Sequence, residues 1–81
     1  MINTNKAREA LYAVYDACRN VVAELEAEEA QIWHTADKGR RACTPKEIRR
    51  LDEIAEQLEA VYEEIKAISR AVALIDDYAG E

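Results

Sequence analysis

The chain has 81 residues, of which 11 are Lys or Arg and 17 are Asp or Glu, so its formal net charge is −6. Hydrophobic residues make up 49%, with two Gly and one Pro, which excludes an intrinsically disordered chain and a sheet of many short strands. This composition favours one domain of long helices. The sequence contains no apolar run of the length that a secretory signal or a bilayer span needs, so we expect a cytoplasmic protein with no membrane partner.

A first helix is predicted over residues about 4–37, where apolar residues recur three or four positions apart. Asn3, Thr4 or Asn5 can cap its start. Its end is marked by Gly39, which we expect in the left-handed conformation just beyond the last turn. The apolar positions that form its expected seam are Ala7, Leu11, Val14, Cys18, Val21 and Leu25.

A basic loop over 38–44 separates this helix from a second, predicted over about 45–78. Thr44 and Glu47 have the spacing of a capping box, and Pro45 between them suits the first helical position. The apolar residues that follow keep a heptad rhythm without interruption, which is typical of helices packed side by side. They are Leu51, Ile54, Leu58, Val61, Ile65, Ile68, Val72, Ile75 and Ala79.

Two helices of equal length joined by a short loop predict an all-α antiparallel hairpin, coiled-coil-like, that forms one domain over residues 1–81. Folding at the loop brings residues whose numbers sum to about 80 to the same level. Glu28 then lies on the seam near Arg49 and Arg50. We expect one of these arginines to pair with it, or else a partly hydrated site near the end of the bundle.

Each apolar stripe is wider than a two-stranded coiled coil requires. Small scaffolds without disulfides or metals usually gain stability by association, and twofold dimers are the commonest oligomers. We therefore expect a homodimer that forms a four-helix bundle, with a hairpin docked on a different protein as the alternative. The residues expected in the oligomer core are Leu11, Val14, Cys18, Leu25, Leu58, Ile65 and Val72.

Positive charge is concentrated around the loop, in a group that we call the basic tip. The ordinary interpretation is that these residues complement the helix dipole and pair with nearby acids. The alternative is a contact with phosphate or an acidic partner, although the acidic remainder of the chain argues against general affinity for nucleic acid. The basic tip consists of Lys38, Arg40, Arg41, Lys46, Arg49 and Arg50.

Negative charge is concentrated on the second helix, in a group that we call the acidic belt. A solvated helix face has this pattern. The functional interpretation is a surface that mimics the charge of nucleic acid and occupies a basic groove on an enzyme, as small phage and plasmid proteins that block host defences do. The acidic belt consists of Asp52, Glu53, Glu56, Glu59, Glu63 and Glu64.

Trp33 lies outside the seam and close to the basic tip. Tryptophan is enriched at binding hot spots, so this residue is a candidate contact with a foreign partner. The alternative is that it covers the end of the bundle or packs between two copies of the chain.

The sequence predicts neither a catalytic centre nor a cofactor or metal site. One His and two distant Cys do not make a four-ligand zinc site, and no nucleophile has an evident base beside it. Cys18 lies inside the first helix and Cys43 beyond its end, too far apart for a disulfide within one chain.

Together these features predict a non-enzymatic small acidic protein that binds a larger protein as a regulator or inhibitor, such as a phage or plasmid accessory or anti-defence protein. Two alternatives remain open. One is a helical-hairpin dimer that binds RNA or DNA through Lys38, Arg40, Arg41, Arg49 and Arg50. The other is a purely structural oligomerisation element.

Overall fold

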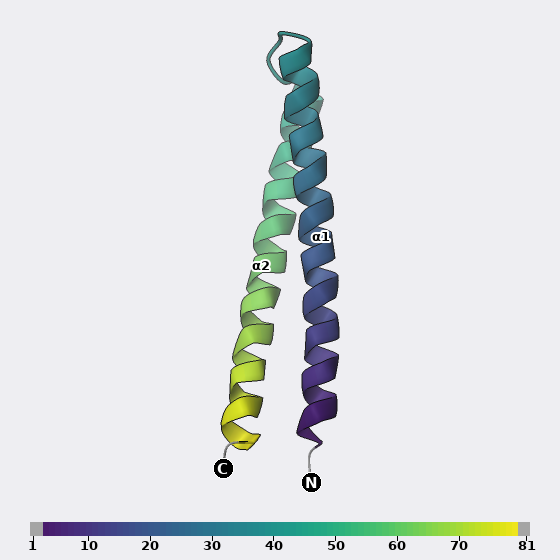
Figure 1. Cartoon of the computed structure of the whole chain (residues 1–81). Coiled ribbons are helices and arrows are strands. Elements are labelled where there is room, and N and C mark those ends of the chain that lie inside the picture. The colour runs from purple at the N-terminus through teal and green to yellow at the C-terminus, as the bar shows by residue number, and fades with distance from the viewer. Residues whose placement is uncertain (1–2, 80–81) are drawn as a thin grey trace.

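A computed structural model describes the backbone of residues 3–79 and the side chains of residues 3–78. Within that range the fold consists of α1 (Thr4–Lys38) and α2 (Pro45–Ala79), with no strand. The helices run side by side in opposite directions, and both termini lie at the end away from the loop (Figure 1). The predicted all-α hairpin is thus confirmed. Residues 1, 2, 80 and 81, which the predicted domain includes, lie outside the described part, as does the side chain of Ala79.

Side chains close the start of each helix. The backbone N–H of Lys6 donates to Oδ1 of Asn3 at 3.1 Å, so Asn3 is the cap of α1. At α2 the N–H of Glu47 donates to Oγ1 of Thr44 at 3.2 Å, while the N–H of Thr44 donates to Oε1 of Glu47 at 2.8 Å. These reciprocal bonds are the capping box that the sequence predicts, and they satisfy N–H groups that have no partner inside the helix.

The end of α1 differs from the prediction, because Gly39 has a right-handed backbone with φ −79° and Arg40 takes the left-handed one with φ 51°. The N–H of Arg40 donates to the carbonyl of Asp37 at 3.0 Å, and that of Arg41 to the carbonyl of Ala36 at 3.1 Å. In this Schellman arrangement the left-handed residue is the second one after the helix. Because α1 extends to Lys38, one residue beyond the expected end, that position falls on Arg40.

The hydrophobic core is a thin line between the helices. The expected seam of α2 lies along it, but the seam of α1 is corrected at Val14 and Val21, whose side chains are 50% and 41% exposed. Tyr15 and Val22 lie half-buried on the other side of the same stripe. One partner helix covers only part of the wide stripe on α1, so one of its edges stays in solvent. The described apolar side chains that are fully or nearly buried are Cys18, Leu25, Ala36, Ile54 and Ile68.

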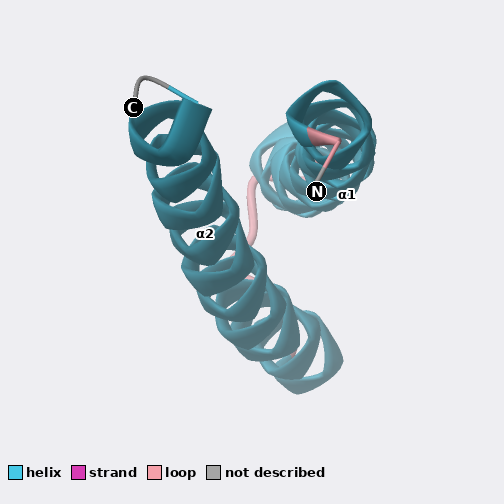
Figure 2. Cartoon of the chain, turned by 90° about the horizontal axis from the view of Figure 1, so that it is seen from below, coloured by secondary structure: helices cyan, strands magenta, loops and turns pink. Residues whose placement is uncertain are grey.

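The molecule is a rod of 60 × 15 × 14 Å with a radius of gyration of 18.2 Å. A globular domain of this length has a radius of gyration of about 12 Å. Seen nearly along α1, α2 runs at a slant, so the helix axes cross (Figure 2). Neither helix, over the residues described, has the uncharged apolar length that crossing a bilayer requires.

Candidate functional site

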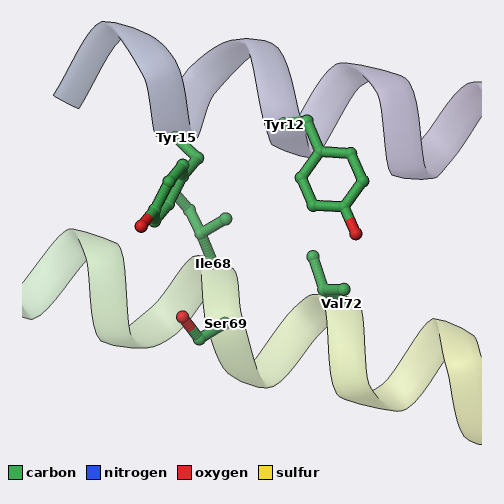
Figure 3. Close-up of a pocket in the computed structure, with 5 residues that line it drawn as sticks. All are labelled: Tyr12, Tyr15, Ile68, Ser69 and Val72. Carbon is green, nitrogen blue, oxygen red and sulfur yellow. The ribbon is translucent and has the colours of Figure 1, made fainter. Parts of the chain in front are cut away.

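Three hollows follow one another along one face of the hairpin, and together we call them the tyrosine groove. The first, of 380 Å³, shares Tyr15 with the second, of 440 Å³, and the second shares Tyr62 with the third, of 500 Å³. In the first hollow the ring of Tyr12 stands over Val72, and the ring of Tyr15 lies beside Ile68 (Figure 3). Tyrosines from both helices therefore line neighbouring hollows beside the core.

Two charged side chains of α1, seven residues apart, also lie on this face. Nη1 of Arg19 donates to the hydroxyl of Tyr15 at 3.2 Å, and the guanidinium lies 5.9 Å from the centre of that ring. Across the groove, the hydroxyl of Tyr62 donates to Oε1 of Glu26 at 3.1 Å. This hydrogen bond, together with burial, raises the pKa of Tyr62, so the phenol stays a donor at neutral pH. The hydroxyl groups of Tyr15 and Tyr62 are thus held by hydrogen bonds while their rings line the groove.

Two arginines of the basic tip are engaged within the chain. Arg41 reaches both carboxylate oxygens of Glu47, at 2.6 and 3.2 Å. Arg50 donates to both oxygens of Glu28, the bond from Nη2 being 2.7 Å long, and to Glu53 at 3.1 Å. The predicted pairing of Glu28 with an arginine of the loop region is therefore confirmed. These hydrogen bonds raise the pKa of Arg50 and lower the pKa of Glu28.

The other members of the basic tip are exposed and make no ion pair within the described residues. They surround the loop, where the left-handed Arg40 makes the turn. The basic charge that faces solvent freely is thus smaller than the sequence suggests. These four residues are Lys38, Arg40, Lys46 and Arg49.

All six residues of the acidic belt are exposed on α2. Glu63 pairs with Lys66 at 3.2 Å, and Glu64 accepts a hydrogen bond from the thiol of Cys18, with the sulfur 3.8 Å from the carboxylate oxygen. Burial raises the pKa of the Cys18 thiol, and Glu64 raises it further. Over the described part of the chain Asp52, Glu56 and Glu59 are in no ion pair. The belt therefore carries acidic groups that are free to meet a basic surface.

Trp33 is 57% exposed in the last two turns of α1, and Ile48, 51% exposed, lies in the first turn of α2 at the same end. Two large apolar side chains thus face solvent near the loop. This exposure fits a surface that contacts another macromolecule, whichever of the two predicted partners covers it.

The residues expected in the oligomer core divide into three groups. Cys18 and Leu25 are buried in the hairpin itself, while Val14 remains half-exposed. The others are half-buried along the seam, with part of each side chain accessible to a second hairpin: Leu11, Leu58, Ile65 and Val72.

The groove, and the part that Tyr12, Tyr15 and Tyr62 have in it, was not predicted from the sequence. A signal was present: Tyr12, Arg19, Glu26 and Trp33 follow one another at intervals of seven residues. Positions seven apart lie on one line along a packed helix.

No protein-family model, no curated protein and no solved structure matches this chain. Among the described residues, no three His, Cys, Asp or Glu side chains are grouped so as to hold a metal ion. The exposed features of the described chain are the tyrosine groove, the acidic belt and the apolar residues near the loop.

Proposed function

We propose that this chain is a non-enzymatic binding protein: an acidic helical hairpin that pairs with a second copy and binds a larger protein as a regulator or inhibitor. The observation that carries the proposal is the imbalance between its small core and its large exposed surface. Only five described apolar side chains are buried, and the accessible surface is 6305 Å².

The size of that surface indicates association. A compact protein of 9.2 kDa exposes roughly 4,900 Å², so this hairpin exposes some 1,400 Å² more. A stable interface covers about 800 Å² on each partner. The excess is sufficient for one standard interface with area to spare. Two hairpins that form a four-helix bundle are the simplest way to cover it, because a twofold dimer needs no other component.

The acidic belt supports a second, different partner. Opposite the belt, α1 contributes Glu24 and Glu29, and the ranges 21–36 and 51–61 contain no Lys or Arg. Such a surface attracts a protein with a basic cleft and steers its approach. A bound acidic hairpin would occupy a cleft that otherwise receives nucleic acid, and this is the regulatory or inhibitory action that we propose.

The basic tip supports nucleic-acid binding less well. Arg41 and Arg50 are held by carboxylates of the same chain, so they cannot neutralise phosphates without losing those bonds. The net charge of −6 repels a nucleic-acid backbone along the rest of the rod.

Affinity capture from the cells that encode the chain tests this function, with two variants matched in charge. One neutralises the belt by Glu56→Gln, Glu59→Gln and Glu63→Gln. The other makes three exposed neutralisations towards the open end, Glu9→Gln, Asp16→Asn and Asp77→Asn. Each captured protein is then purified and its binding to all three chains is measured at increasing salt.

We expect the belt variant to bind about tenfold more weakly than the wild type, the control to bind almost normally, and wild-type affinity to fall with salt. Equal binding by the two variants, salt-independent binding, or recovery of RNA in place of a basic protein would contradict the proposal.

A further inference from the structure

One line of side chains on α1 has a self-complementary order. Tyr12, Arg19, Glu26 and Trp33 are separated by seven residues each, so the order along the helix is aromatic, basic, acidic, aromatic. All four are exposed, Tyr12 at 50% and Trp33 at 57%. The first three line the tyrosine groove. We call this set the α1 line.

We propose that a second copy of the chain docks antiparallel on the tyrosine groove, with the two α1 lines against each other. This inference rests on the proposed dimer and adds to it the surface used and the orientation. The twofold axis lies midway between Arg19 and Glu26, at the level of Val22 and Tyr62, which line the same hollow.

Charge selects the orientation. In the antiparallel arrangement Arg19 of each copy faces Glu26 of the other, which gives two attractive pairs for one interface. A parallel arrangement in the same register sets Arg19 against Arg19 and Glu26 against Glu26, with one repulsive pair at each level. Antiparallel copies also keep the two basic tips at opposite ends, whereas parallel copies bring the two tips, and their like charges, together.

The aromatic residues complete the pairing. When the copies are antiparallel, Trp33 of one lies level with Tyr12 of the other, at the first hollow. That hollow is lined by the rings of Tyr12 and Tyr15 together with Ile68, Ser69 and Val72 (Figure 3). Aromatic rings that pack in such a pocket are typical anchors of an interface. Trp33 is thereby assigned to the contact between copies, while Val14, on the opposite flank of α1, falls outside it.

The surface that each copy would bury in this arrangement is large enough for a stable dimer. With the axis at this level, α1 overlaps its copy over about 31 residues, or roughly 46 Å. On a rod 15 Å wide this corresponds to a flat projection of roughly 700 Å² per copy, near the 800 Å² or so that each partner of a stable interface covers. Because side chains project from the helices, the real contact area is larger than this flat projection.

Charge reversal tests the surface. The dimer dissociation constant is measured by sedimentation for Arg19→Glu, Glu26→Arg and the double variant, with helicity checked by circular dichroism. Each single change acts twice in a symmetric dimer, so we expect about tenfold weaker association or more, and near wild-type association for the double variant. Matched controls are the exposed Glu24→Arg and Arg70→Glu, which should leave association unchanged.

Spin labels on the native Cys43, near the loop, test the orientation, since Cys18 is buried at 7% exposure and is protected from labelling. Antiparallel copies place the two labels about 50 Å apart, whereas parallel copies place them within about 20 Å. A distance near 50 Å together with recovery in the double variant supports the inference. A short distance, or single variants that dimerise like the controls, overturns it while the dimer itself stands. A monomer at every concentration overturns the proposed dimer as well.

Discussion

Arg40 shows how a single backbone conformation decides the shape of the loop. With φ at 51° it occupies a region that favours glycine, although a glycine is present one residue earlier. The sequence indicated the correct cap but the wrong residue, because the position of a left-handed residue depends on where the helix ends. A local pattern leaves that end uncertain by a residue or two.

Glycine at position 40, or a residue with a side chain at position 39, should stabilise the hairpin. Arg40→Gly relieves the left-handed backbone and should raise the free energy of unfolding by about 1 kcal/mol. Gly39→Ala should raise it by about 0.4–1 kcal/mol, because the backbone is right-handed there and an added Cβ would lie 3.4 Å from its nearest neighbour, the carbonyl oxygen of Thr35. Urea denaturation measures both. A loss of stability in Gly39→Ala would contradict the observed loop.

Glu47 links the capping box to pH. Hydrogen bonds from Arg41, and then from Thr44, lower the pKa of Glu47 from an ordinary value of 4.5 to about 2. Because the folded-state pKa lies below the unfolded one, Glu47 contributes stability that is complete above pH 4.5 and is lost as the pH falls towards 2. The lowered pKa of Glu28 beside Arg50 acts in the same direction.

We therefore expect the free energy of unfolding to fall between pH 4.5 and 2, and to fall less steeply in Glu47→Gln, which cannot be protonated. Thermal unfolding followed by circular dichroism across this range measures the slope. Glu56→Gln, at an exposed position, serves as the control and should keep the wild-type slope. An unchanged slope in Glu47→Gln would show that the hydrogen bonds to this carboxylate do not persist in solution.

The face that each helix buries was easier to predict for α2 than for α1. Every position of the α2 heptad through Ile75 is buried or half-buried, so the uninterrupted heptad identified the line of α2 that faces α1. On α1 three adjacent lines are apolar, and the structure covers Tyr15 and Val22 while Val14 and Val21 stay exposed. A pattern of apolar residues shows the width of a stripe but not which edge of it the partner covers.

Because Ile54 is buried and Val14 is half-exposed, truncating these two side chains to alanine should lower the free energy of unfolding by different amounts. Ile54 has no exposed surface, so Ile54→Ala should lower the free energy of unfolding by about 3 kcal/mol. Val14→Ala removes atoms that are already half in water and should cost less than about 1 kcal/mol. Chemical denaturation of the two variants compares them. A cost for Val14→Ala that equals that of Ile54→Ala would place Val14 in a contact that the hairpin does not make.

The candidate surfaces were predictable only in part, for a related reason. Sequence gives the positions of Trp33, the basic tip and the acidic belt, because these depend on residue type. Whether an arginine is free depends on which carboxylates lie within its reach. The pairing of Glu28 with Arg50 followed from the register, whereas the local pairing of Arg41 with Glu47 was not predicted. The tyrosine groove also depends on the register, since its rings come from both helices.

At the scale of the whole molecule, the rod distributes its surfaces between two tasks. The α1 line and the first two hollows of the tyrosine groove are assigned to a second copy. The acidic belt on α2, of which Glu59 and Glu63 line the third hollow, is assigned to a larger protein. In an antiparallel dimer the two belts lie on separate hairpins and the two basic tips at opposite ends. One assembly could therefore hold two partner molecules, which would increase its avidity for a partner that is itself multivalent.

Sedimentation equilibrium of the wild-type chain alone, from micromolar to millimolar concentration, tests the central claim most directly. The claim is that the hairpin exposes more apolar surface than a single copy can hide. The predicted result is a reversible approach to twice the mass of 9.2 kDa as concentration rises, with helicity retained. A fully helical, cooperatively unfolding species of 9.2 kDa at every concentration would contradict it.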